Sequence, residues 1–189
     1  MERYFTDCEP TDLTDRIAES ILKSVIAAGK VLMENPTDYN ARATIMWGSS
    51  LSHNGLTACG RENALAVHQL EHALSGEYDF IAHGAGLAVL FPAWARYVYK
   101  YKPSRFAQFA RRVFDVVEEN DMIAAEKGIA EMEKFFKFIK MPLTLREFNI
   151  PESSMDRLAE LCTYGKTRVI KNYIPLDYEA IKEIYKSCY

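Results

Sequence analysis

Apolar residues recur every three or four positions along most of the chain, which is the spacing of one face of an α-helix. The clearest run comprises Leu13, Ile17, Ile21, Val25, Ala28 and Leu32. Thr11 is a candidate N-cap for this helix, and Asn35-Pro36 is expected to end it. The same spacing predicts further helices, at about residues 37–54, 62–75, 83–101, 104–117, 122–139, 153–164 and 178–186.

Four residues are expected to bound or interrupt these helices. Gly76 should stop the third helix, because glycine is common just after a helix C-terminus. Pro92 lies inside the fourth helix and is a candidate site for a kink or break, because proline lacks a backbone N–H. Asp121 and Asp177 are candidate N-caps, because their side chains can accept a free N–H of the first turn.

Only residues 167–174 alternate weakly, so they are the one segment expected to be extended. No run of period-two strands is present, and the chain is therefore predicted to be one all-α domain over residues 1–189. The sequence also contains no G-x-G-x-x-G and no alternation of strands with helices. We therefore expect no dinucleotide-binding domain within it.

The charge balance is close to neutral, since 26 acidic and 23 basic residues give a net charge of −3. This offers no reason to expect a nucleic-acid partner. The longest apolar stretch, residues 85–95, is too short to span a bilayer, and no apolar leader follows Met1. A cytoplasmic protein without a membrane partner is expected. The cysteines form no C-x-x-C pair, which argues against a zinc ribbon or a thioredoxin motif; they are Cys8, Cys59, Cys162 and Cys188.

The most informative feature is a cluster of histidines. His68 and His72 are four residues apart on a predicted helix, so they share one face. His83 begins the next helix, and a short turn can bring it back to the face that carries His68. Imidazole is a common ligand of zinc and iron, so these side chains are candidates for one metal or one reacting centre. The alternative is ordinary histidines on an amphipathic helix.

The same window matches a different motif. Residues His68-Gln69-Leu70-Glu71-His72 spell H-x-x-E-H, the inverted zinc-peptidase signature, in which both histidines bind zinc and the glutamate is the general base. This alternative needs a distant acidic ligand, and it leaves His83 without a role. The candidates for that ligand are Glu147, Glu152 and Glu160.

Several separated segments resemble the C-terminal helical domain of the iron-containing (group III) alcohol dehydrogenases, in particular the NAD(P)-dependent butanol- and aldehyde-reducing members. The resemblance implies the helical fold of the iron-containing alcohol dehydrogenase and dehydroquinate synthase-like proteins. It covers the chain specifically up to about Tyr101 and the remainder by helical layout. The matching segments are residues 18–22, 39–50, 54–56, 66–75 and 83–94.

In that family one Fe²⁺, or Zn²⁺, is held by an aspartate and three histidines, and NAD(P) sits on a separate N-terminal domain. By resemblance, His68 and His83 match the two late metal ligands. His72 matches a histidine beside the nicotinamide and substrate, which is a candidate proton relay. Trp47 and Ser50 match the helix that borders the substrate cleft. The resemblance assigns no cofactor-binding residue to this chain.

Three features depart from the family pattern. The two early ligands form a D-x-x-x-H pair, and here only Asp79 and His83 have that spacing, within the late-ligand segment. The missing pair would lie just before residues 1–5, and the whole N-terminal nucleotide-binding domain would lie outside the chain. The loop from His72 to His83 is also one residue longer than the commonest family spacing.

The resemblance thus implies part of an oxidoreductase that interconverts small alcohols with aldehydes or ketones. The chain alone is expected to be inactive and to hold metal weakly or not at all. A non-catalytic partner subunit of a split dehydrogenase is a further alternative. The face that a nucleotide domain would cover, near Trp47 and Leu51, is expected to be exposed and to favour a homo-oligomer.

Overall fold

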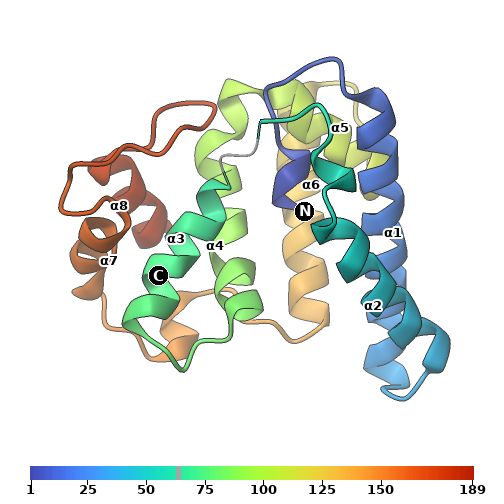
Figure 1. Ribbon diagram of the computed structural model, residues 1–189, viewed down its shortest axis with the longest axis horizontal. Coiled ribbons are helices and arrows are strands. Elements are labelled where there is room, and N and C mark those ends of the chain that lie inside the picture. The colour runs from blue at the N-terminus through green and yellow to red at the C-terminus, as the bar shows by residue number, and fades with distance from the viewer. Residues whose placement is uncertain (63–64) are drawn as a thin grey trace. The chain divides into compact units, whose positions relative to one another are not determined.

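The computed structural model describes residues 1–62 and 65–189, in which helices are the dominant element (Figure 1). The α-helices are α1 (Asp12–Glu34), α2 (Tyr39–His53), α3 (Ala66–Glu77), α4 (His83–Val98), α5 (Pro103–Val113), α6 (Asp121–Phe138), α7 (Ser154–Cys162) and α8 (Tyr178–Ser187). Short 3-10 helices are η1 (Glu2–Tyr4), η2 (Leu56–Ala58), η3 (Tyr99–Tyr101) and η4 (Leu145–Phe148). The predicted all-α fold is confirmed. The segment expected to be extended contributes one isolated antiparallel bridge, between Ile170 and Leu176.

These elements gather into two compact units. Within the described residues, the first unit comprises residues 1–62 and 103–139, with α1, α2, α5 and α6. The second comprises residues 65–102 and 140–189, with α3, α4, α7 and α8. The single domain over residues 1–189 stays a prediction. None of the helices that the structure describes is both long and apolar enough to cross a membrane.

Most helix boundaries follow local side-chain chemistry. Thr11 precedes α1 as predicted, and the side chains of Asp38 and Asp177 cap α2 and α8 by accepting a backbone N–H of the first turn. The cap of α6 is different from the prediction. Asn120 accepts the N–H there, and Asp121 is the first residue inside the helix. Asparagine and aspartate can both act as N-caps. Asn120 is the cap here because its backbone is extended, whereas Asp121 is already helical.

The predicted limits of α3 are wrong at both ends. Glu62 lies outside any helix, residues 63–64 lie outside the described residues, and Leu65 has a left-handed φ of 46°, so the helix begins at the next residue. Gly76 does not stop the helix, which continues to Glu77. Glycine ends a helix where the backbone turns left-handed, and the φ of Gly76 stays outside that region.

The helices around the interior proline and the following turn also differ from expectation. α4 continues through Pro92, which is buried, and ends at Val98 without a break at the proline. The packing of the buried Pro92 ring thus outweighs the loss of one backbone hydrogen bond in α4.

α5 ends at Val113 and not at residue 117, because Asp115 takes a left-handed φ of 55°.

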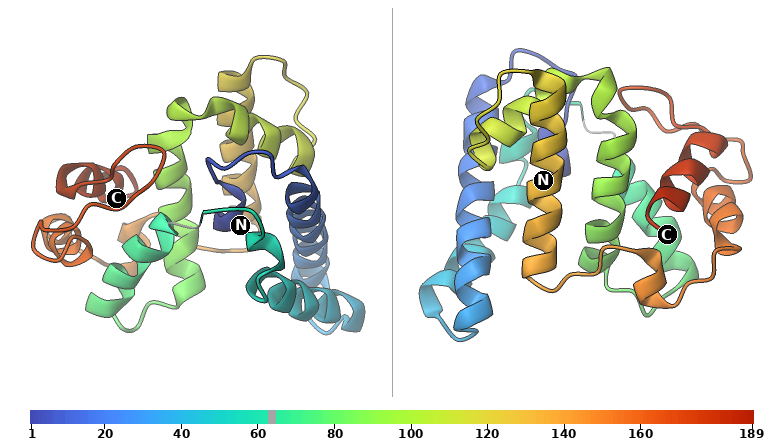
Figure 2. Two further views of the ribbon diagram at one scale, coloured as in Figure 1. Left: turned by 45° about the horizontal axis from the view of Figure 1, so that its top comes forward. Right: turned by 180° about the vertical axis from the view of Figure 1, so that it is seen from behind.

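In the first unit α1 and α2 lie side by side and are joined by a short turn (Figure 2). α5 packs closely against α6, and α1 also contacts α5. A small residue makes the contact between α5 and α6 close. A Cβ at Gly128 would lie 2.5 Å from the Cβ of Ala110, so only glycine lets the two helices approach this far.

The apolar stripe predicted along α1 is only partly buried. Leu13, the first member of the stripe, is 75% exposed. The buried positions of the helix include two carboxylates, Asp15 and Glu19. A buried charge is costly unless it is paired and hydrogen-bonded, so these two residues must have partners elsewhere in the unit.

Asp15 is the centre of a buried polar cluster, the Asp15 network, which comprises Asp15, Tyr4, Arg61, Arg105 and Gln108. The two guanidinium nitrogens of Arg105 lie 2.5 and 2.6 Å from the Asp15 oxygens, and Arg61 donates to the same carboxylate. Arg105 also donates to the backbone carbonyl of Tyr4. Burial raises the pKa of Asp15, but hydrogen bonds from Arg105 and Gln108 and the nearby positive charges outweigh it and lower the pKa to about 2.

We expect Asp15→Asn to lower the free energy of unfolding by about 3–5 kcal/mol, because it leaves two buried guanidinium groups without a counter-charge. The pKa of the native carboxylate is depressed from its ordinary value of 3.8 to about 2. Its stabilisation is therefore fully present above pH 3.8 and is lost as the pH falls through the folded-state value. Urea unfolding as a function of pH measures both effects, and Asp15→Asn should flatten the acid limb.

A matched control is Asp12→Asn on the same helix, because Asp12 forms exposed ion pairs with Arg16 and Arg112. Exposed pairs add little, so this variant should unfold much like the wild type. Equal stability of the Asp15 and Asp12 variants would contradict the structural role of the Asp15 network.

The second unit is built around the buried side of α3. α3 packs on α4 and α7, and α8 packs on α4 and α7. The hydroxyl of Tyr185 donates to the carbonyl of Leu70 over 2.6 Å, which fixes α8 to α3. The core of this unit includes Leu70, Leu74, Leu90, Trp94, Met155, Leu158, Ile181 and Ile184. This packing holds the segment that carries the histidine cluster.

Candidate metal centre

α3 carries two histidines on one face. His68 and His72 are one helical turn apart, so their side chains leave the helix in similar directions. The other side of the helix is fully buried through Val67, Leu70 and Leu74. His68 is half-buried and His72 is exposed. The apolar contacts thus hold α3 so that its imidazoles face outward.

The turn after α3 brings in a third histidine. Ile81, inside this turn, is buried and anchors it, and His83 is the first residue of α4. The ring centroid of His83 lies 5.3 Å from that of His68 and 5.4 Å from that of His72. The centroids of His68 and His72 are 6.3 Å apart. The predicted return of His83 to the face of His68 is confirmed.

Glu71 completes the cluster from the buried side of α3. Its side chain is 0% exposed, and one carboxylate oxygen contacts Nδ1 of His83. Glu71, His72 and His83 each offer a donor atom within 4.8 Å of the others. From the sequence alone, Glu71 was expected to have a role only in the peptidase alternative. The available signal was its position on the helix face shared with Leu70 and Leu74, where a carboxylate needs a partner.

Two predicted cleft residues belong to the first unit and lie on α2. Trp47 is 64% exposed, and the hydroxyl of Ser50 donates to the carbonyl of Met46. Tyr39 and Met46 on the same helix are also exposed, as expected for an apolar surface there. The place of Trp47 and Ser50 beside a substrate, and self-association through this surface, stay predictions.

The remaining histidine, His53, ends α2 and is exposed. Its Nδ1 lies 2.8 Å from the hydroxyl of Ser52 and 3.2 Å from the carbonyl of Ser49. These are local contacts of a helix C-terminus, and they indicate a structural role.

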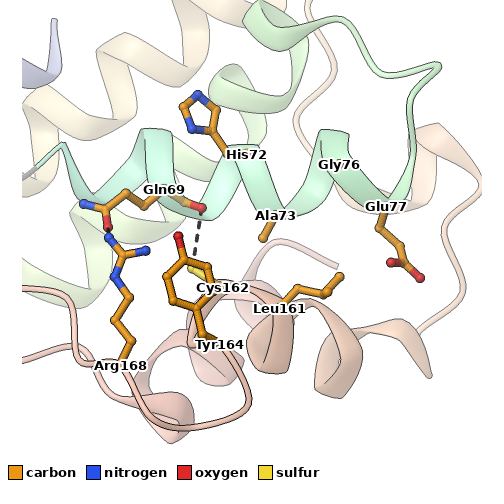
Figure 3. A pocket seen from close by; sticks show the side chains of 9 residues that line it. All are labelled: Gln69, His72, Ala73, Gly76, Glu77, Leu161, Cys162, Tyr164 and Arg168. Atoms are coloured by element: carbon orange, nitrogen blue, oxygen red, sulfur yellow. Dashed lines mark hydrogen bonds between the residues drawn. The ribbon is translucent and has the colours of Figure 1, made fainter.

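A pocket of about 500 Å³ lies along α3 on the side of α7. Figure 3 shows the imidazole of His72 directed away from Cys162 and Tyr164 across the helix. Arg168 donates to the side chain of Gln69 and lies over the ring of Tyr164. The thiol of Cys162 donates to the carbonyl of Gln69, and burial raises its pKa to about 11. Such a thiol is a poor nucleophile, so the pocket carries no cysteine chemistry.

The acidic residues that the peptidase alternative needs do not join the histidines. Glu147 accepts the backbone N–H groups of Leu143 and Thr144 at the start of η4, which is a structural task. Glu152 and Glu160 are likewise absent from the donor cluster. Of the acidic side chains in the described part of the chain, only Glu71 is grouped with histidines. The geometry thus favours a site built from α3 and α4 alone within this unit.

The whole chain, residues 1–189, matches the C-terminal part of the Fe-containing alcohol dehydrogenase family. The chain belongs to the iron-containing alcohol dehydrogenase family. The resemblance inferred from the sequence is confirmed. Because the match is continuous over both units, it favours the dehydrogenase interpretation over the zinc-peptidase alternative.

The chain is similar in sequence and structure to several members of this family. The chain is 34% identical to NADH-dependent butanol dehydrogenase A of Clostridium acetobutylicum, over 100% of this chain and 49% of that protein. It is 30% identical to NADPH-dependent aldehyde reductase YqhD of Escherichia coli, over 94% of this chain and 46% of that protein. The crystal structure of NADH-dependent butanol dehydrogenase A from Thermotoga maritima matches with a TM-score of 0.91 and 34% identity, over 99% of this chain and 48% of that one. The chain thus spans about half the length of the curated relatives it matches.

Proposed function

We propose that this chain is the metal-binding part of an NAD(P)-dependent, iron-type alcohol dehydrogenase that interconverts small alcohols with aldehydes or ketones. The observation that carries the proposal is the convergence of His68, His72 and His83, whose ring centroids lie 5.3–6.3 Å apart on the outward face of α3 and α4. Family membership supports the same reaction class, because the relatives are named as butanol dehydrogenases and an aldehyde reductase.

The donor set fits the metals that the family name implies. Imidazole nitrogens suit Fe²⁺ and Zn²⁺, whereas oxygen-only sites suit magnesium or calcium. We assign His68 and His83 as ligands from this chain, and further ligands would come from elsewhere in the complete enzyme. When bound, such a metal supplies a Lewis acid for the alcohol or carbonyl oxygen.

His72 is assigned as the proton relay. It is the exposed member of the histidine pair on α3, and an imidazole side chain is the commonest general acid or base in enzymes. Its neighbours on α3 are fixed by the buried face, so the ring stays close to the two proposed ligands. Trp47 and Ser50 are assigned to the substrate cleft on the strength of the family resemblance alone.

The nicotinamide cofactor is assigned to another part of the complete enzyme. The described residues form helices without the strand–helix units and glycine-rich turn that hold a dinucleotide. The chain spans about half of its relatives, which agrees with this assignment.

The 189-residue chain is expected to bind Fe²⁺ or Zn²⁺ weakly, because two neutral imidazoles are fewer ligands than transition-metal sites usually have. Affinity should fall as the pH is lowered, because only the neutral imidazole binds metal and protons compete with the metal for it. Isothermal titration with Zn²⁺ at neutral and mildly acidic pH measures both effects. Stoichiometric metal that survives dialysis against a chelator would contradict the assigned ligand set.

A further inference from the structure

Glu71 is a buried carboxylate on the helix that carries His68 and His72. It follows His68 by three residues and precedes His72 by one, yet its side chain is 0% exposed. One of its oxygens contacts Nδ1 of His83, and the other, Oε1, makes no hydrogen bond among the described residues. A buried carboxylate is costly when it is poorly paired, so the contact with His83 carries most of its compensation.

The first turn of α4 is shaped around this carboxylate. A Cβ at Gly86 would lie 2.8 Å from Oε1 and 2.8 Å from Cγ of Glu71. Glycine at this position therefore leaves room for the glutamate side chain between α3 and α4. His83 lies three residues earlier on the same turn, with its side chain 49% exposed. The ring also lies beside the rings of His68 and His72, but the contact with Glu71 is the one made through its Nδ1.

The chemistry of the contact fixes the protonation of the ring. A carboxylate only accepts hydrogen bonds, so Nδ1 of His83 must carry the proton. In a neutral imidazole the other nitrogen, Nε2, then keeps its lone pair. Metal-binding histidines commonly donate their second ring nitrogen to a carboxylate in this way.

We propose that Glu71 is a positioning residue, which holds His83 in the tautomer and direction that present Nε2 to the metal. The inference rests on the proposed function of His83 as a ligand, and it adds the residue that prepares this ligand before metal arrives. Glu71 acts through His83 and does not itself need to touch the metal.

The first test reads the tautomer in the metal-free chain, by ¹⁵N chemical shifts of the His83 ring at mildly alkaline pH. The wild type should show a protonated Nδ1. Glu71→Ala should move the proton to Nε2, which is the tautomer that exposed histidines favour in water. Glu71→Gln should keep it on Nδ1, because the amide oxygen still accepts. Glu77→Gln, at the exposed end of α3, is the matched control and should change nothing. The same His83 tautomer in wild type and Glu71→Ala would overturn the proposal.

The second test is Zn²⁺ affinity of the same 189-residue variants by calorimetry. Glu71→Ala should weaken zinc binding about 10–100-fold, which is typical for loss of a group that orients a ligand. Gly86→Ala should weaken it as well, because its new Cβ displaces the carboxylate without removing it. Glu71→Gln should retain more affinity than Glu71→Ala. If Glu71→Gln lost as much as His83→Ala, Glu71 would be a ligand and the positioning role would be wrong.

The His83→Ala variant distinguishes the proposed role of His83 as a metal ligand from the proposed role of Glu71 as its positioning residue. Unchanged zinc affinity in this variant would overturn the proposed function of His83 and, with it, the purpose assigned to Glu71. Reduced affinity in His83→Ala but wild-type affinity in Glu71→Ala would overturn the role of Glu71 alone. We expect reduced zinc affinity in both His83→Ala and Glu71→Ala. Among the Glu71 and Glu77 variants, only Glu71→Ala should change the tautomer of His83.

Discussion

The 189-residue chain by itself is expected to leave NADH and NADPH unoxidised in the presence of butyraldehyde. Hydride transfer needs the nicotinamide carbon held about 3–3.5 Å from the carbonyl carbon. The helices of the described residues offer no glycine-rich phosphate loop to hold that cofactor. The two assigned ligands, His68 and His83, also leave the metal site incomplete. Absorbance of the reduced nicotinamide measures the rate directly.

Activity should appear when the chain is joined to the N-terminal nucleotide-binding domain that the family resemblance implies, with a D-x-x-x-H pair at its end. The matched control is the same fusion with that aspartate and histidine replaced by alanine, which should stay inactive. Supplying the domain as a separate polypeptide tests the split-dehydrogenase alternative. Turnover by the 189-residue chain alone would show that the proposal of a partial enzyme is wrong.

Within such a completed enzyme, the three clustered histidines should divide into two classes. His68→Ala and His83→Ala should lose bound metal and activity together, because each removes an assigned ligand. His72→Ala should keep its metal and lose about 10²–10⁴-fold in rate, which is the usual contribution of a positioned acid–base group. Metal analysis and steady-state kinetics on each variant separate the classes.

His53→Ala is the control for this series, because the contacts of His53 are local to the end of α2. It should retain both metal and rate. Loss of metal in His72→Ala as complete as in His68→Ala would show that the assigned roles are wrong. In that case the pair at one helical turn, His68 and His72, would be the ligand pair.

The helical fold could be predicted because the apolar spacing is local and repeats through nearly every segment. The predicted helix boundaries and buried faces were wrong where tertiary packing overrides the local preference of a residue. Pro92 stays inside α4 because its ring is buried, and Gly76 stays helical because nothing turns the backbone left-handed there. Leu13 is exposed although it is the first member of the apolar stripe, because Asp15 and its partners occupy the buried side of α1.

In the candidate site, too, the features set by local spacing could be predicted and those set by packing could not. Spacing alone placed His68 and His72 on one face, and a short turn was enough to expect His83 beside them. The contact of Glu71 could not be predicted from the motif, because it depends on which face of α3 is buried. It also depends on the absence of a side chain at Gly86 on another helix. Such information comes from packing between segments and not from the sequence of either one.

The Asp15 network also sets an order of events during synthesis. Arg105 reaches the backbone of Tyr4 across 101 residues of chain. A ribosome adds about 5–20 residues per second, so the first residues wait roughly 5–20 seconds before this arginine exists. Until then Asp15 has Arg61 as a partner but lacks Arg105 and Gln108. The buried carboxylate therefore reaches its complete set of partners only after α5 has been synthesised.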